Sequence, residues 1–159
     1  MTYDQQLQTV TDIMRSTSIA SLAYISVEGD LVSTPMGTQD FTEPGTVWFI
    51  SQRGTDKAIA LERDARVNVH YAGKEGWVSL AGTARFSDDR AKLRELWDAS
   101  ADAFMEGGVD DPGTGLIEVT ATSAEYWDSP GKVAMAVQFV KGLVSDEETD
   151  LGDSGVVAL

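Results

Sequence analysis

The chain has 159 residues, with 26 Asp and Glu against 12 Lys and Arg, no cysteine and a single histidine. A formal charge of -14 disfavours nucleic acids and anionic membranes as partners, because both are polyanions. Without cysteine the chain has no disulfide or thiolate nucleophile, and with His70 alone it has no multi-histidine cluster, so no metal site is expected. The start of the chain lacks a signal-peptide pattern and no apolar run reaches about 20 residues, which predicts a cytoplasmic protein without a membrane span.

The first part of the chain predicts a helix followed by three strands. Apolar residues three and four apart predict the helix over residues 4–16. Two apolar runs, 19–27 and 31–39, flank a Glu-Gly-Asp turn and predict a hairpin, and residues 46–51 predict a third strand. Pro35 places part of the second strand at a sheet edge or bulge. A short helix then follows a cap at Thr55 or Asp56.

The second part predicts three more strands, over residues 66–71, 77–86 and 116–128, with a helix over 88–104. The apolar segment 133–144 fits a helix or a strand equally well. Because no helix separates the first three strands, the order favours an antiparallel sheet or barrel with flanking helices over a doubly wound parallel sheet. After residue 145 come five acidic and no basic residues, so a domain over 1–145 and an acidic, flexible tail over 146–159 are expected.

The segment 51–57 has the features of an anion site. It runs from a strand end into a helix start, where backbone N–H groups and the helix dipole favour negative charge. It adds the hydroxyls of Ser51 and Thr55 and the cations of Arg53 and Lys57, in a chain that has few cations. The simpler alternative is that Thr55 caps the helix and Lys57 is a surface residue.

Other polar and aromatic residues give weaker signals. His70 lies inside a strand pattern, which is more typical of a structural than of a catalytic histidine. Trp77 and Trp127 stand at strand ends, where they could stack on a planar ligand or lie in a dimer interface. No residue stands out as a general acid or base, so the catalytic residues are not predicted.

Three runs in order resemble the pyridoxamine 5′-phosphate oxidase-like FMN-binding split-barrel proteins, and most closely their general stress protein branch. The first is Ser-Thr-Pro-Met-Gly-Thr-Gln over 33–39. The second is Val-Trp-Phe-Ile-Ser over 47–51 with Gly-Thr-Asp-Lys over 54–57. The third is Trp-Val-Ser-Leu-Ala-Gly-Thr-Ala-Arg over 77–85, and the late Ala-Glu-Tyr-Trp-Asp-Ser-Pro over 124–130 is also similar to that branch.

The resemblance implies a mainly β (α+β) fold, a six-stranded antiparallel split barrel that forms a homodimer and binds FMN at the subunit interface. It places the phosphate at Thr55 and Lys57, and Trp77 near the flavin of the other subunit. Together with Arg53 from the anion pattern, the expected cofactor-binding residues are Thr34, Pro35, Met36, Gly37, Gln39, Ile50, Ser51, Arg53, Thr55, Lys57, Trp77 and Trp127.

The function that the resemblance implies is an FMN-binding flavoprotein, an oxidoreductase of the general stress protein type with a small-molecule redox partner that the sequence does not name. Two alternatives stay open: a non-catalytic flavin-binding or flavin-sensing stress protein, and a deazaflavin-dependent reductase. The second alternative arises because many relatives have arginine where this chain has Thr34. Pyridoxamine-phosphate oxidation itself is not expected, since the chain has few cations for a second phosphate.

Overall fold

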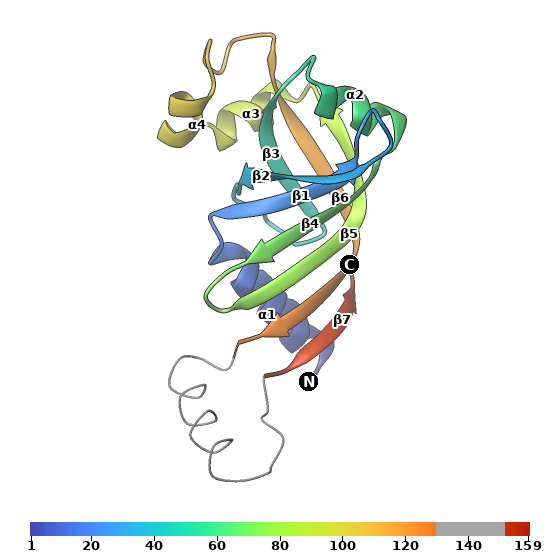
Figure 1. Ribbon diagram of the computed structural model, residues 1–159. Coiled ribbons are helices and arrows are strands. Elements are labelled where there is room, and N and C mark those ends of the chain that lie inside the picture. The colour runs from blue at the N-terminus through green and yellow to red at the C-terminus, as the bar shows by residue number, and fades with distance from the viewer. Residues whose placement is uncertain (130–151) are drawn as a thin grey trace, which may run out of the picture.

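The computed structural model describes residues 1–129 and 152–159, which form one antiparallel sheet with flanking helices (Figure 1). The elements in chain order are α1 (Tyr3–Arg15), β1 (Ile19–Ile25), β2 (Leu31–Gly37), β3 (Thr46–Gln52), α2 (Asp56–Arg63), β4 (Arg66–Ala72), β5 (Gly76–Ser87), α3 (Arg90–Leu96), α4 (Ala99–Phe104), β6 (Thr114–Asp128) and β7 (Ser154–Ala158).

The strands pair in the order β2-β1-β4-β5-β6-β3, and every pairing is antiparallel. The long strand β6 carries two partners on one edge, because β3 pairs with its first half and β7 with its last residues. The end strands β2 and β3 approach each other without pairing, so the sheet curls into a barrel that is split between them (Figure 1). The predicted antiparallel α+β fold is confirmed, and Pro35 lies in the edge strand β2.

Two apolar clusters hold the helices on the sheet. The main core fills the barrel and includes the inner face of α1, where Val10, Ile13 and Met14 are at most 1% exposed. A smaller cluster joins α3 and α4 to the sheet through Ile50 on β3 and Leu116 on β6. Among the described residues, no helix is both long and apolar enough to cross a membrane.

The helix predicted over 88–104 is divided into two short helices, α3 and α4. The backbone of Trp97 is extended, with φ -70° and ψ 125°, and this ends α3. The carboxylate of Asp98 then accepts a hydrogen bond from the N–H of Ala101 at 2.8 Å and caps α4. The apolar spacing of the sequence missed this break because an aspartate cap competes with continuation of the helix at a point where periodicity carries no signal.

The prediction of a flexible tail over 146–159 is wrong for residues 154–158, which form β7. Val157 is 1% exposed within the main core, and the hydroxyl of Tyr3 donates to the carbonyl of Ala158 at 3.1 Å. Gly155 lets the strand pack closely against Tyr126, since a Cβ there would lie 3.0 Å from the Tyr126 ring. The prediction rested on the acidic residues alone and did not take into account Val156 and Val157, which follow them in the sequence. The remaining part of that prediction and the apolar segment 133–144 lie outside the described residues.

Replacing Asp128 by asparagine should stabilise the protein at neutral pH. Partial burial and the nearby charges of Asp153 and Glu75 raise the pKa of Asp128, so the folded state binds more protons than the unfolded state. Stability is therefore lost as pH rises from the ordinary value of 3.8 through the raised pKa. Asp128→Asn should raise Tm by a few degrees at pH 7, measured by circular dichroism, and not at pH 3. An equal rise at both pH values would contradict the electrostatic explanation.

Candidate functional site

A cavity of about 570 Å³ lies where the barrel is split, between β2 and β3. This volume falls within the range of about 300–1,000 Å³ that is typical of small-molecule sites. Its walls come from β2 and its following loop, the end of β3, the turn into α2, and α4. The lining residues are Ile19, Pro35, Met36, Gly37, Gln39, Ile50, Ser51, Gln52, Thr55, Lys57, Ser100, Ala101, Phe104 and Met105.

The turn from β3 into α2 brings a helix start to this cavity. Gly54 has φ +70°, a conformation that favours glycine and reverses the chain sharply. Thr55 caps α2, with its side-chain oxygen accepting a hydrogen bond from the N–H of Ala58 at 3.3 Å. The other N–H groups of the first helical turn have no partner within an α-helix. The predicted cap at Thr55 is confirmed, and the helix start faces a cavity.

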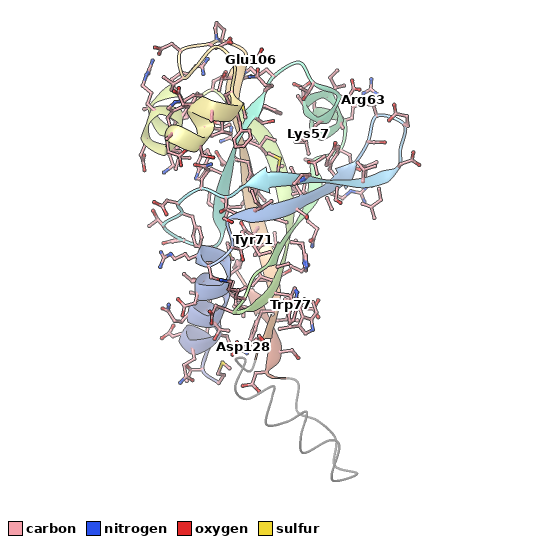
Figure 2. All side chains as sticks on the ribbon, turned by 60° about the vertical axis from the view of Figure 1, so that its left-hand side comes forward. Lys57, Arg63, Tyr71, Trp77, Glu106 and Asp128 are labelled. Carbon is pink, nitrogen blue, oxygen red and sulfur yellow. The ribbon has the colours of Figure 1, made fainter. Side chains whose placement is uncertain are left out.

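Lys57 supplies the positive charge of the cavity (Figure 2). Its side chain is half-buried, and burial lowers the pKa of the ammonium group. The Nζ atom lies 3.3 Å from the thioether sulfur of Met36, and Lys57 forms no ion pair with any described carboxylate. The neighbouring Asp56 is exposed and does not line the cavity. A half-buried cation without a carboxylate partner favours an anionic ligand.

Eight of the twelve residues expected to bind a cofactor line this cavity: Pro35, Met36, Gly37, Gln39, Ile50, Ser51, Thr55 and Lys57. The other four, Thr34, Arg53, Trp77 and Trp127, do not line it. Thr34 is close, and its hydroxyl lies 3.8 Å from the sulfur of Met36. Arg53 instead forms an ion pair with Asp88.

Trp77 and Trp127 lie opposite each other on β5 and β6 and are 45% and 39% exposed. Trp77 stands toward the far end of the sheet from Lys57 (Figure 2), and Trp127 pairs with Trp77, so neither lines the cavity. The sequence patterns alone did not distinguish ligand contact from a place in a dimer interface.

Six lining residues were not expected: Ile19, Gln52, Ser100, Ala101, Phe104 and Met105. Four of them belong to α4 or the residue after it, which the sequence analysis placed at the end of a continuous helix. The signal that could have found them is Asp98, whose side chain caps α4 and thereby turns a new helix toward the cavity. Phe104 is 82% exposed, which is high for an aromatic residue on a cavity wall.

The lining of the cavity is almost entirely uncharged. Apart from Lys57, its lining has no acidic, basic or histidine side chain among the described residues. No group of three or more potential metal ligands occurs within residues 1–129 and 152–159. The arrangement places one cation at the start of α2 and an uncharged wall along β2 and α4.

Fold and cavity together define a small antiparallel split barrel with a cavity at the split. The sequence profile of the family described as pyridoxamine 5′-phosphate oxidase like matches residues 5–150. The chain belongs to this family.

Similar proteins come from fungi and bacteria. Protein bli-3 of Neurospora crassa is 27% identical over 154 residues, which is 86% of this chain and 73% of that protein. A candidate general stress protein 26 of Jannaschia sp. CCS1 has a TM-score of 0.79 and 26% identity, with 98% of this chain and 99% of that chain covered. The general stress FMN/FAD binding protein of Xanthomonas citri has a TM-score of 0.69 and 26% identity, over 78% of this chain and 89% of that chain.

Proposed function

We propose that this protein is an FMN-binding flavoprotein, an oxidoreductase of the general stress protein type. The observation that supports it best is Lys57, a half-buried cation without a carboxylate partner among the described residues, at the start of a helix that faces the cavity. The name of the similar Xanthomonas citri protein, a general stress FMN/FAD binding protein, agrees with this proposal.

The lining residues fit such a cofactor. Lys57, Thr55 and the first N–H groups of α2 would hold the phosphate, because an ammonium group and a helix start both favour a dianion. The uncharged edge of β2 at Pro35 to Gly37 and the wall of α4 would hold the flavin ring. Bound FMN would supply the hydride and electron chemistry, while the chain would bind and orient it.

One observation favours a second candidate, a flavin-binding or flavin-sensing protein without turnover. The described lining holds no side chain that could act as a general acid or base, apart from the ammonium of Lys57. A protein of this kind would bind FMN tightly and leave it unreduced by nicotinamide donors.

Titration of the purified protein separates these possibilities. We expect FMN to bind one equivalent per chain with quenching of flavin fluorescence, and NADH or NADPH to bleach the bound flavin under anaerobic conditions. Binding without bleaching would favour the second candidate. Stronger binding of a deazaflavin than of FMN would assign the chain to deazaflavin-dependent reductases. Failure to bind either compound would exclude the proposed function.

We further propose that the site is completed by a second copy of the chain across the outer face of the sheet. That face exposes Trp77 and Trp127 and, on β7, Val156, which is 65% exposed. An apolar group of this kind is typical of a protein interface.

Replacing Trp77 by glutamate should therefore dissociate the dimer. We expect a mass of twice 17.1 kDa for the wild type and 17.1 kDa for the variant by light scattering, with weaker FMN binding by the monomer. Ala91→Glu, which adds the same charge at an exposed position of α3, is the control and should leave both properties unchanged. A dimeric Trp77→Glu variant would contradict the assignment of this face.

A further inference from the structure

The side chain of Arg53 is anchored to the end of β5, outside the cavity. Its Nη2 atom donates to the carbonyl of Ser87 at 3.0 Å and pairs with the carboxylate of Asp88 at 2.5 Å. The guanidinium carbon also lies 5.6 Å from the ring centre of Phe86, within cation–π distance. These contacts tie the turn between β3 and α2 to the end of β5, which lies beyond β6 in the same sheet.

The backbone of Arg53 is tied to a second neighbour. Its N–H donates to the carbonyl of Gly113 at 2.7 Å, in the loop that precedes β6. That loop is held in turn by Arg90, whose guanidinium donates to the carbonyl of Thr114 at 2.6 Å and to that of Asp111 at 2.9 Å. In a chain with twelve cations, two arginines are thus used to fix one turn and the loop beside it.

Gly115 leaves the space through which the Arg53 side chain passes. A Cβ at this position would lie 3.0 Å from the Nε atom and 3.3 Å from the Nη2 atom of Arg53. Gly115 pairs with Ser51, and Ser51 lines the cavity. The guanidinium of Arg53 therefore lies beside a strand pair that contributes to the cavity wall.

We propose that Arg53 is a positioning residue, which fixes the turn so that Thr55 and the Lys57 ammonium stay aimed at the anion. The proposal rests on the proposed function, since the anion is the FMN phosphate. Its physical basis is the left-handed Gly54 between Arg53 and Thr55, because glycine is the most flexible point at which a turn could loosen. A turn held in place before binding loses less conformational entropy when the ligand binds.

The competing role is direct contact of Arg53 with the phosphate, as the sequence alone suggested. That role requires the guanidinium to leave Asp88. The ion pair is partly exposed, with 32% and 92% of the two side chains accessible, so it contributes little by itself, and the anchor depends mainly on the Ser87 carbonyl and the ring of Phe86. The two roles therefore predict different results when both residues are replaced. Direct contact predicts that the two losses in FMN affinity multiply, whereas positioning predicts that they overlap.

A double-mutant cycle with Arg53→Met and Lys57→Met separates the roles. FMN and riboflavin affinities are measured by fluorescence quenching, with Arg94→Met as the matched control, because Arg94 forms an exposed pair with Asp110 away from the cavity. We expect Arg53→Met to weaken FMN binding about tenfold and riboflavin binding less than about twofold. The double variant should bind FMN far less than tenfold more weakly than Lys57→Met alone, because only the positioning of Thr55 remains to be lost. Losses that multiply would show direct contact and overturn the proposal, as would equal losses for FMN and riboflavin.

Amide hydrogen exchange tests the same proposal without a ligand. In Arg53→Met, residues 53–58 should exchange faster than in Arg94→Met, while β4 and β5 should be unchanged. Unchanged exchange at 53–58 would overturn the positioning role, whether or not FMN binds. Failure of the wild type to bind FMN would instead exclude the proposed function, so the two failures are distinguishable.

Discussion

Replacing Lys57 by methionine should weaken FMN binding by about tenfold to a hundredfold, the range expected for a hydrogen bond to a charged group. Methionine keeps the length of the apolar stem and removes only the ammonium group, which is the one cation that lines the described cavity. Riboflavin, which lacks the phosphate, should bind the variant and the wild type with similar affinity. The measurement is fluorescence titration of both flavins.

The same variant carries a stability prediction for the ligand-free protein. Burial lowers the pKa of Lys57 below 10.5, so the folded state binds fewer protons than the unfolded state in this range. The free energy of unfolding should therefore rise as pH increases from the lowered pKa toward 10.5, and Lys57→Met should lose this rise.

The binding experiment has its own contradicting outcome. If Lys57→Met bound FMN and riboflavin with equally reduced affinity, this would contradict the role of Lys57 and indicate general damage to the cavity.

The sequence predicted those residues of the cavity lining that are close together in the chain. Residues 35–39 and 50–57 form a strand edge and a strand-to-helix turn, and the types of residue in them indicate an anion at a helix start. The position of the Arg53 side chain outside the cavity could not be predicted, because a cation in such a turn has two possible partners. Whether it faces the ligand or the end of β5 depends on Ser87 and Asp88, which are more than thirty residues away in the sequence.

The fold could be predicted where its elements are encoded by neighbouring residues. The prediction failed where an element depends on residues far away in the sequence. Hairpins and caps are encoded by neighbouring residues, and the antiparallel order follows from short connections. Strand β7 pairs with β6, although residues 130–151 separate the two strands in the sequence. No local pattern in the sequence therefore predicts this pairing. The wall that α4 contributes to the cavity was missed because the cap at Asp98 redirects a helix that periodicity alone would extend.

Replacing Leu93 by alanine should produce the largest loss of stability among the changes considered. Leu93 is 1% exposed on α3 and packs in the cluster that includes Ile50, Leu96 and Leu116. Truncation of a fully buried leucine costs about 2–5 kcal/mol, which corresponds to a fall in Tm of about 5–15 °C for a chain of this size. The control is Leu31→Ala, because Leu31 is 75% exposed and its loss should cost no more than about 0.5 kcal/mol.

The effect of Leu93→Ala on binding should differ in kind from that of Lys57→Met. The cluster around Leu93 includes Ala101, which lines the cavity, so loosening it disturbs the wall formed by α4 and leaves the anion end intact. FMN and riboflavin should therefore lose affinity in equal proportion, measured by titration well below the lowered Tm. If only the affinity for FMN fell, the result would contradict this expectation. It would indicate that α3 and α4 support the helix start at Thr55 and that the phosphate binds nearer to α4.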